Sequence, residues 1–469
     1  MNAKSLISNA ATAFLAQGIA VVISFFQGLI IPKMLGLEQY GYWQLFLFYA
    51  TYVGLFHLGL PDGVYLLCGG QRRDEIDKAS IGSQFVFGML YQAIFCVILI
   101  VVALFFVPIQ ERAFVVLCTS VYMLTLNAAT YLGYVFQAMN ETKIFSYSAI
   151  VLRVSFFIPL AALLVLRVHA FEPYVLAYVF SSVCQLVYCL WHARDFFHAG
   201  FIGWGAAATE SWASVRVGFK LLVANLASIL VLGIARFAID RTWDISTFGK
   251  LSFALSMVNF FANFVTQASM VLFPALRQSE DEEVAKFYAS ARDFMMLVFP
   301  VAYLVYFPGI WLLGLWLPDY ASSFGYLALL LPICVFDSRM EITCTTLFKV
   351  RREERLLLRI NLVTCAASAL GALAGVYLFH DPFFVIAFAV VAIVGRSVWS
   401  EYYLNGALAS PAGGRSLAEM ALTLVFLASA FLLPPALATV LYAAAYSLYL
   451  FVYRARLKTL ATSLRRVAR

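Results

Sequence analysis

Fourteen long apolar stretches follow one another along this 469-residue chain, separated by short connectors that carry most of the charge. Each stretch holds 17 to 29 residues, and roughly 20 apolar residues let an α-helix cross a bilayer. Hydrophobic residues make up 63% of the chain and charged residues 12%, against about 45–50% and 25% in soluble domains. Because so much apolar surface cannot stay exposed to water, a soluble, disordered or secreted protein is excluded. The sequence predicts an all-α, polytopic membrane protein with about 14 transmembrane helices.

Charged residues, proline and glycine bound the predicted spans. Their ranges are 7–31, 42–68, 80–106, 113–138, 144–166, 173–190, 217–239, 247–275, 293–316, 322–348, 356–379, 382–404, 417–433 and 436–453. Residues 191–215 form the longest connector, and Pro434 and Pro435 join the last two spans into a tight hairpin. The first stretch is too long for the core of a signal peptide, so we expect it to be retained as a span.

The distribution of lysine and arginine predicts the orientation of the chain. With the N-terminus in the cytoplasm, 23 of the 32 basic residues lie in cytoplasmic segments and four in outer connectors. Positive charge is retained on the cytoplasmic side, so we expect both termini there. The tail 454–469 has six basic residues and no acidic ones, which suits contact with anionic lipid headgroups. The net charge of +7 therefore requires no nucleic-acid partner.

The sequence has no motif for catalysis or cofactor binding. Eight cysteines lie in or beside apolar stretches, without the paired spacing of disulfides or of metal sites. No glycine-rich phosphate loop, nucleophile elbow or metal motif is present, so ATP-driven transport lacks support. We therefore predict that the protein is not an enzyme, with no catalytic residues, no metal and no other cofactor.

Two short matches indicate an internal repeat. The segment IPKMLGLEQYG (31–41) aligns with IDRTWDISTFG (239–249) at an offset of 208, and FQAMNETK (136–143) aligns with FKVRREER (348–355) at an offset of 212. The first pair joins the first connector to the seventh, and the second joins the fourth to the tenth. Two matches in order at nearly one offset predict two six-helix halves.

The repeat suggests a domain organisation. We predict an N-terminal six-helix lobe over 1–190, a cytoplasmic connector over 191–215 and a C-terminal six-helix lobe over 216–404. A C-terminal helical hairpin with a basic tail follows over 405–469. Because six is even, both lobes enter the bilayer in the same direction and are related by a pseudo-two-fold axis along the membrane normal. Secondary transporters are commonly built this way, with the substrate site between lobes that rock to give alternating access.

Several segments resemble a known family. They are LEQYGY (37–42) followed by LGL (58–60), FQAMNETK (136–143) with Arg153 beyond it, and IDR (239–241) leading to FG (248–249). On these residues the chain resembles polysaccharide flippases of the Wzx type, in the multidrug/oligosaccharidyl-lipid/polysaccharide exporter superfamily. The resemblance rests on motifs over residues 1–280 and on topology beyond them. The chain departs from the family at Lys250, where an aromatic residue usually follows the glycine.

The resemblance implies a substrate, a location and partners. The expected activity is export of a polyprenyl-diphosphate-linked oligosaccharide across the bacterial inner membrane, for O-antigen, lipopolysaccharide or exopolysaccharide biosynthesis. Membrane lipids would surround the carrier, and a polysaccharide polymerase and a chain-length regulator are the implied protein partners. The residues alone indicate only a two-lobed membrane carrier.

Five basic residues lie within the predicted spans or at their rims: Arg153, Arg236, Lys250, Arg339 and Arg396. A charge inside a span costs about 2.5–3.5 kcal/mol, so it normally faces a cavity or a partner. A guanidinium can hold two phosphate oxygens at once, which makes these residues candidates for binding the diphosphate. The alternatives are a structural pair for Arg153 and Arg339, snorkelling to the interface for Arg396, and a rim salt bridge for Arg236.

A second set of residues could couple transport to an ion. His57 and Asp62 flank a predicted helix break at Pro61, where they could bind a proton or sodium, although a hydrogen-bonded core histidine is the simpler interpretation of His57. Asp337 and Glu341 lie one turn apart and share a helix face, whereas Arg339 points elsewhere. These two carboxylates are expected either to bind a basic residue of another helix or to face the cavity.

Two other functions are weighed against the flippase. A multidrug cation antiporter of the same superfamily would need acidic residues to dominate its cavity, and arginine dominates the spans here. An integral membrane glycosyltransferase or polymerase would need acidic residues on a large outer loop, and every outer connector is short. Flipping of lipid II is closely related to the first hypothesis, but the arginines expected for it in the first two spans are missing.

Overall fold

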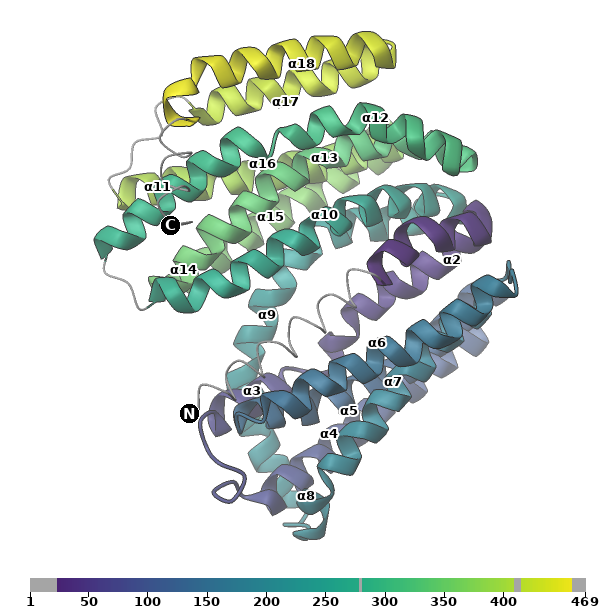
Figure 1. Cartoon of the computed structure of the whole chain (residues 1–469). Helices are drawn as coiled ribbons and strands as arrows, with labels where there is room; N and C mark the ends of the chain where they lie inside the picture. Colours follow the sequence, from purple (N-terminus) through teal and green to yellow (C-terminus); the bar gives the residue numbers. More distant parts are fainter. Residues whose placement is uncertain (1–22, 278–280, 409–414, 458–469) are drawn as a thin grey trace. The chain divides into compact units, whose positions relative to one another are not determined.

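The computed structural model describes residues 23–277, 281–408 and 415–457, which form helices joined by short turns (Figure 1). Contacts divide the chain into two compact units, one ending at Leu226 (unit 1) and one beginning at Ala227 (unit 2). The division falls inside the long helix Trp204–Thr242 (α9). The prediction of an all-α, polytopic membrane protein is confirmed, and the predicted ranges of lobes, connector and hairpin stay predictions.

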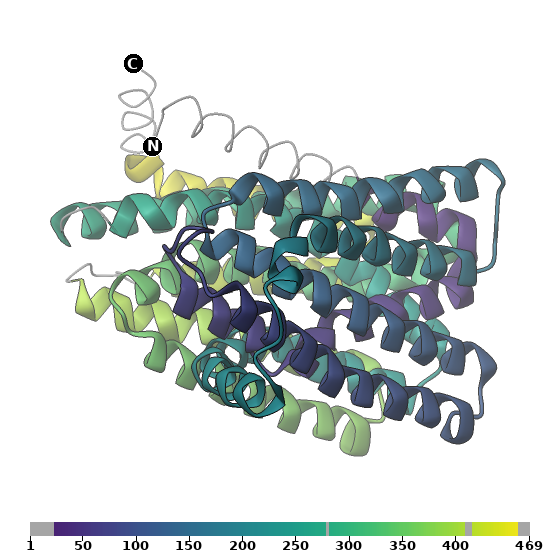
Figure 2. The same cartoon turned by 90° about the horizontal axis from the view of Figure 1, so that it is seen from below.

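Unit 1 is built around the helix Gln110–Ala138 (α5). Its other helices are Ile31–Tyr52 (α2), Leu60–Cys68 (α3), Lys78–Phe106 (α4), Thr142–Val165 (α6), Glu172–His192 (α7), Arg194–His198 (α8) and the first part of α9. α5 packs against α2, α3, α4, α6 and α7, and Figure 2 shows α4 to α7 running alongside one another. Half of the most apolar window of α5 is buried by these neighbours, so α5 is the core of the unit.

The predicted connector 191–215 is partly helical. α7 ends at His192, α8 follows, and α9 begins at Trp204 although the sequence placed the seventh span from residue 217. Ala207, Ser211 and Ser214 lie on one buried face of this early part of α9. A face of small and hydroxyl residues has low hydropathy, which is why the apolar pattern did not reveal the helix.

Unit 2 is built around the helix Phe324–Arg339 (α13). The other helices of the unit are Ile245–Arg277 (α10), Asp281–Val298 (α11), Val301–Trp316 (α12), Thr346–Val350 (α14), Glu354–Ala374 (α15), Pro382–Ala407 (α16), Arg415–Leu432 (α17) and Pro435–Val452 (α18). α13 packs against α10, α12, α16 and α17. A wide helical turn, Met340–Thr345, joins α13 to α14 directly after Arg339. Such turns occur mostly as single insertions in helices and often at functional sites.

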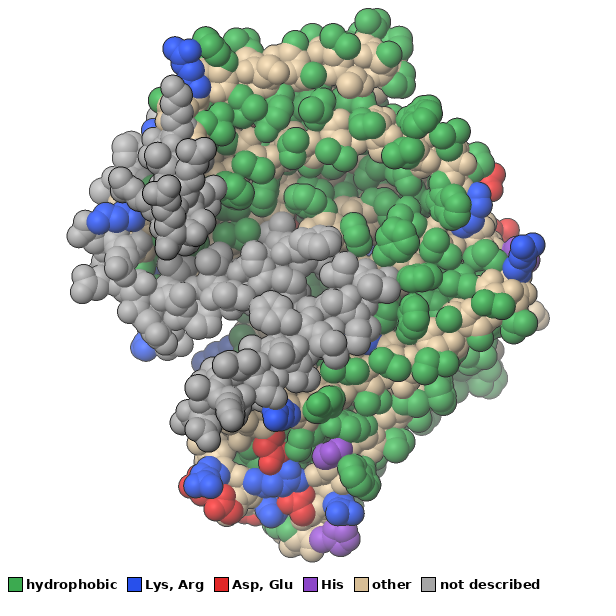
Figure 3. All heavy atoms as spheres, viewed as in Figure 1, with side chains coloured by type: hydrophobic (Ala, Val, Ile, Leu, Met, Phe, Trp, Pro, Cys, Tyr) green, Lys and Arg blue, Asp and Glu red, His purple; other side chains and the backbone are tan. Residues whose placement is uncertain are grey.

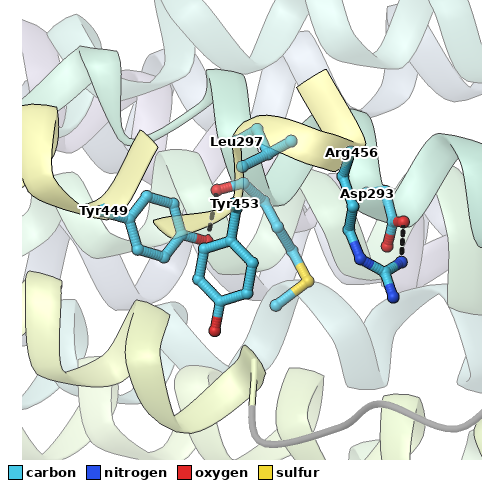
Figure 4. Close-up of a pocket in the computed structure, with 6 residues that line it drawn as sticks. Asp293, Leu297, Tyr449, Tyr453 and Arg456 are labelled. Atoms are coloured by element: carbon cyan, nitrogen blue, oxygen red, sulfur yellow. Dashed lines mark hydrogen bonds and ion pairs between the residues drawn. The ribbon is translucent and has the colours of Figure 1, made fainter. Parts of the chain in front are cut away.

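A row of tyrosines on α18 holds the bend in the predicted ninth span. The span breaks between α11 and α12 at Pro300, which has no N–H to bind the carbonyl of Met296. The hydroxyls of Tyr442, Tyr446 and Tyr449 donate to the carbonyls of Pro300, Leu297 and Met296 at 2.9, 2.7 and 3.1 Å, respectively. Figure 4 shows Tyr449 in this position, with an ion pair between Arg456 and Asp293 beside it. Tyr449 thus supplies the donor that the proline removes at Met296, and the other two tyrosines add hydrogen bonds to neighbouring carbonyls.

The helices account for most of the predicted spans. In the described part of the chain, eleven helices are long and apolar enough to cross a membrane, or twelve when the bent pair Ile23–His57 and Leu60–Cys68 counts as one span. The apolar helix Ser416–Leu432 is shorter, and most of the predicted first span lies outside the described residues. The number of fourteen spans stays a prediction.

The turn after α5 has a backbone arrangement that ends many helices. The N–H of Glu141 donates to the carbonyl of Phe136 at 2.8 Å, and the N–H of Asn140 donates to the carbonyl of Gln137 at 3.1 Å. Asn140 is left-handed, with φ of 62°. This pair of bonds around a left-handed residue satisfies carbonyls that the helix leaves unpaired.

The turn after α14, in the segment that the second sequence match aligns with the first turn, repeats this arrangement. The N–H of Glu353 donates to the carbonyl of Phe348 at 2.7 Å, and the N–H of Arg352 donates to the carbonyl of Lys349 at 3.2 Å. Arg352 is left-handed, with φ of 56°. The sequence match therefore corresponds to a repeated turn, while the symmetry of the complete lobes stays a prediction.

Candidate functional site

The predicted second span is broken where His57 and Asp62 lie. The helical path bends by 56° between Ile23–His57 and Leu60–Cys68. Leu58 and Gly59 are both left-handed at the bend, with φ of 54° and 83°. The ring Nδ1 of His57 accepts a hydrogen bond from the N–H of Gly59 at 3.0 Å, and Tyr91 donates to the His57 carbonyl at 2.8 Å. His57 therefore stabilises the break itself, which is the core-histidine alternative, and its role in ion coupling stays a prediction.

Glycines allow a close helix contact beside this break. A Cβ on Gly63 would lie 1.9 Å from the carbonyl oxygen of Ser214, and a Cβ on Gly218 would lie 2.0 Å from the carbonyl oxygen of Gly59. α3 and the early part of α9 can therefore approach only because these positions lack side chains. Asp62 is buried in the first turn of α3, where the helix dipole favours a negative charge.

Arg153 lies inside the membrane-spanning helix α6. It is eleven residues from the start of α6, a rise of roughly 16 Å, and its side chain is half-buried. Phe156, one turn further along, stacks on Trp43 with ring centroids 6.1 Å apart, and Tyr178 of α7 meets Phe156 edge-on at 5.0 Å. This buried aromatic packing fixes the rotation of α6 and with it the direction of Arg153.

Charged side chains gather at one end of unit 1, near α8, while the long helices present mostly hydrophobic side chains (Figure 3). The centre of this group is Arg73, which binds both oxygens of Asp195 at 3.1 and 2.7 Å and Glu141 at 2.7 Å. Lys78 lies 3.1 Å from Asp195. We call Arg73, Lys78, Glu141 and Asp195 the Arg73 cluster. Hydrogen bonds from Arg73 lower the pKa of Asp195 from 3.8 to about 2, although burial opposes the shift.

Arg396 and Asp337 form an ion pair between helices of unit 2. The Arg396 guanidinium donates to Asp337 on α13, to Asn361 on α15 at 3.2 Å and to Ser228 on α9 at 3.3 Å. Its side chain is only 5% exposed, so it does not extend to the interface by snorkelling. The expected contact of Asp337 with a basic residue of another helix is present. Glu341, one turn further along the chain, is half-buried.

Arg339 is enclosed by two carboxylates. Its Nη1 donates to Glu419 on α17, and its Nη2 lies 3.3 Å from Glu401 on α16. The three side chains are between 1% and 3% exposed. The structural pair, one of the two alternatives weighed for Arg339, is therefore present in this structure. The sequence did not identify its partners, because both carboxylates come from helices whose neighbours and rotation the sequence pattern does not specify.

Arg236 and Lys250 lie near the turn between α9 and α10. Nη2 of Arg236 donates to Ser252 at 3.1 Å, and the guanidinium lies 5.2 Å from the ring centroid of Phe248. Lys250 is half-buried, and Asp240 is buried. Arg236 therefore contacts the segment that carries the predicted family motif, through Phe248. An anion-binding role for Arg236 and Lys250 stays a prediction.

Sequence reasoning missed several residues of these networks. Glu419 was not singled out, although it is the only charged residue of an otherwise apolar predicted span. Arg292 was counted with the cytoplasmic residues, but it is buried and donates to Asn405 on α16. An inventory of acids as well as bases within the spans would have found Glu401 and Glu419. In the described part of the chain, no group of His, Cys, Asp and Glu is arranged to hold a metal ion.

Comparison with known proteins places the chain in a family. A family model described as "Polysaccharide biosynthesis protein" matches residues 6–280, more than half of the chain. The chain belongs to this family. No curated protein sequence matches it.

Two solved structures share the fold of this family member. A structure of the lipid II flippase MurJ in an inward closed conformation is similar with a TM-score of 0.68 and 10% sequence identity, covering 96% of this chain and 99% of that chain. An inward-facing multidrug resistance MATE family transporter of the MOP superfamily has a TM-score of 0.51 and 13% identity, covering 86% and 100%. Identities this low establish the fold alone. The resemblance to a polysaccharide family, inferred from short motifs, is confirmed by the family model.

Proposed function

We propose that this protein is a flippase that moves a polyprenyl-diphosphate-linked oligosaccharide across the bacterial inner membrane for surface polysaccharide biosynthesis. The observation that carries the proposal is the match to the polysaccharide biosynthesis family over residues 6–280. The fold shared with a flippase and with a transporter supports a carrier rather than an enzyme. We further propose alternating access of the two predicted lobes, with both termini in the cytoplasm.

Arg153 is our principal candidate for the diphosphate. The proposal is supported by its depth in α6, its half-buried side chain and its place in the segment that resembles the family. A guanidinium binds phosphate oxygens in pairs and keeps its charge in a desolvated site. Arg236 and Lys250 are proposed as a second set of cations nearer the outer end of their helices. Arg339 and Arg396 are assigned instead to the ion pairs described above.

The lipid part of the substrate needs apolar surface. Unit 2 has an open groove of about 470 Å³ along α16, lined by Val391, Val398, Trp399 and Tyr402 and by Met420 of α17. Its lining is almost wholly apolar, which suits a hydrocarbon chain. A polysaccharide polymerase and a chain-length regulator stay predicted partners.

Lipid II is the second candidate substrate. The structural similarity to MurJ at a TM-score of 0.68 favours it. Against it, no arginine precedes Arg72 in the sequence, although arginines were expected in the first two spans of a lipid II carrier. A multidrug cation antiporter is less favoured, because two of the buried carboxylates of unit 2, Glu401 and Glu419, surround an arginine.

The test is a translocation assay on purified protein in liposomes. A polyprenyl-diphosphate oligosaccharide and lipid II are supplied separately, and transfer is read by a membrane-impermeant enzyme that acts on the exposed sugar. We expect transfer of the oligosaccharide and little transfer of lipid II. Preference for lipid II would support the second candidate, and transfer of neither would refute the proposal.

Arginine variants refine the test. Arg153→Ala should weaken transfer about tenfold or more, because a charge-assisted hydrogen bond contributes about 1.5–3 kcal/mol. Arg153→Lys should recover only part of the loss, since lysine restores the charge without the paired geometry. Arg194→Ala is the matched control, because Arg194 is an exposed residue of α8. Wild-type transfer by well-folded Arg153→Ala would exclude Arg153 from the site.

A further inference from the structure

Exposed basic residues gather where α14 ends and α15 begins. Within eleven residues of the chain they are Lys349, Arg351, Arg352, Arg355 and Arg359. The same stretch contains two acidic residues, Glu353 and Glu354. It therefore carries a surplus of three positive charges at the predicted cytoplasmic end of unit 2.

Three of these arginines have no acidic partner. Arg351 donates to Glu353 at 3.1 Å, whereas no carboxylate among residues 23–277, 281–408 and 415–457 pairs with Arg352, Arg355 or Arg359. We call these three residues the turn arginines. Arg355 and Arg359 lie one turn apart on α15 and so share a face of the helix. Because a guanidinium holds two phosphate oxygens at once, the turn arginines suit an anionic phosphate group.

The helices α15 and α16 run antiparallel and pack closely. A Cβ on Gly371, near the end of α15, would lie 2.4 Å from the Cβ of Phe388, near the start of α16. Further along both helices, Arg396 donates to Asn361 at 3.2 Å. Residues that precede Asn361 in α15 therefore lie level with residues that follow Arg396 in α16.

The apolar groove of α16 ends level with the turn arginines. Arg355 and Tyr402 are each six residues from that hydrogen bond, which places both roughly 9 Å beyond it in the same direction. Tyr402 lines the groove, and its side chain is 80% exposed. The ring of the next residue, Tyr403, lies 5.9 Å from the ring of Phe348 on α14, so the end of α16 contacts the basic turn directly.

The groove extends from this level along the membrane-spanning part of α16. Its lining residues run from Tyr402 back to Val391, a distance of roughly 16 Å along the helix. A hydrocarbon chain in the groove would therefore have its polar end beside the turn arginines. An apolar channel that ends at unpaired guanidinium groups fits a lipid with an anionic phosphate head.

We propose that the turn arginines and the groove form a docking site for the polyprenyl-diphosphate lipid, which this lipid occupies before it crosses the membrane. The turn arginines bind the diphosphate, and the groove holds the nearest part of the polyprenyl chain. The identity of the lipid rests on the proposed function.

Charge and shape favour this lipid over an ordinary anionic phospholipid. A diphosphate that links a polyprenyl chain to a sugar carries two negative charges, whereas a simple phosphodiester headgroup carries one. The surplus of three positive charges matches the diphosphate better. The groove also follows a single helix and suits one chain, whereas a phospholipid has two.

Photochemical labelling of the full-length protein in detergent tests the site. The probe is a polyprenyl diphosphate with a photoreactive group near the diphosphate end of its chain, and mass spectrometry maps the labelled peptides. We expect labelling of the α16 peptide that contains Trp399 and Tyr402. In the combined variant Arg352→Gln, Arg355→Gln and Arg359→Gln, half-maximal labelling should need about tenfold more probe or higher, because each basic residue near an anionic group contributes to binding.

A matched control removes the same charge from unit 1. It combines Lys143→Gln, Arg194→Gln and Arg216→Gln, all at exposed positions, and should be labelled like the wild type. Both triple variants change only exposed side chains and should elute as folded protein. Equal labelling of the wild type and the turn variant overturns the proposal. An equal loss in the control also overturns it, because the effect would then be one of net charge.

Competition identifies the lipid. Unlabelled polyprenyl diphosphate should displace the probe at about one tenth of the concentration needed for phosphatidylglycerol, since it offers twice the charge to the turn arginines. Equal displacement by the two lipids would overturn the choice of lipid and would assign the site to phospholipids of the bilayer.

The liposome assay separates docking from the proposed function. The turn variant should need about tenfold more lipid-linked oligosaccharide for half-maximal transfer and should keep the wild-type maximal rate, because docking precedes the crossing step. An unchanged concentration dependence would refute docking as a step of transfer. If the wild type transfers nothing, the proposed function fails, and the labelling and competition results still decide whether the docking site exists.

Discussion

The turns that follow α5 and α14 share a backbone but differ in what their glutamates bind. In unit 1, Glu141 accepts a hydrogen bond from Arg73, which lies 68 residues away in the chain. In unit 2, Glu353 binds Arg351, only two residues away and partly exposed. Glu141 therefore belongs to a charged cluster that joins distant segments, whereas the ion pair of Glu353 is local, with Tyr403 of α16 as a further neighbour.

The comparison shows that the backbone shape of a turn and the side-chain contacts that stabilise it have different origins. Both turns close through the same pair of backbone hydrogen bonds around a left-handed residue, so local sequence is enough to form them. In unit 1, Arg73 also links the turn to α8, because it binds Glu141 and Asp195 at the same time. The repeated sequence thus gives the same backbone conformation in both turns. Residues outside the repeat determine how much each turn is stabilised by side-chain contacts.

Of the changes that test this comparison, removing Arg73 should produce the largest loss of stability. Arg73→Ala should lower the free energy of unfolding by about 2 kcal/mol, because the partly exposed guanidinium binds two carboxylates and a backbone carbonyl. Arg351→Ala, the control in unit 2, should change it by less than about 0.5 kcal/mol. Thermal unfolding of both proteins in detergent measures the contrast. Equal losses would show that the two turns are held alike.

Acidification should weaken unit 1 through Asp195. Its pKa is lowered in the folded protein from 3.8 to about 2, so the stabilisation is complete above pH 4 to 5 and is lost as the pH falls toward 2. Solvent screening of this partly exposed group limits the effect to about 1 kcal/mol. Unfolding measured from pH 5 to pH 3 should show a smaller decline for Asp195→Asn than for the wild type. Parallel curves would contradict the assignment.

The left-handed residues of the two turns should respond differently to glycine. Arg352→Gly should stabilise the protein by about 0.5 kcal/mol, because arginine tolerates φ of 56° poorly. Asn140→Gly should give a smaller gain, since asparagine adopts this conformation more readily. Denaturation curves of the two variants give the ordering. A larger gain in stability from Asn140→Gly than from Arg352→Gly would contradict the explanation by backbone strain.

The membrane class and the bend in the second span could be predicted from the sequence. Long apolar stretches determine that helices must cross the bilayer, because lipid offers no partners for unpaired backbone groups. Gly59 and Pro61 marked the bend, and the helical path breaks there by 56°. The early start of α9 could not be predicted in the same way, because its buried face is formed by small residues such as Ala207 and Ser211.

The candidate site was predicted less completely. Arg153 lies within a span, as the sequence indicated, and its contact with substrate stays a prediction. Arg339 and Arg396 bind carboxylates of other helices, which is the structural-pair alternative for Arg339 and differs from the snorkelling alternative for Arg396. Arg339 and Glu419 are 80 residues apart, and no local pattern shows that α13 and α17 are neighbours.

The sequence by itself determined which segments are helical and apolar, where most of them end, and that the turn after α5 recurs after α14. These properties depend on residues near one another in the chain. The tertiary structure alone decided which buried charges meet, how Tyr442, Tyr446 and Tyr449 brace the bend at Pro300, and which copy of the turn is fastened by Arg73. Such contacts depend on the rotation and neighbours of whole helices, which are set by packing across the unit rather than by any local pattern.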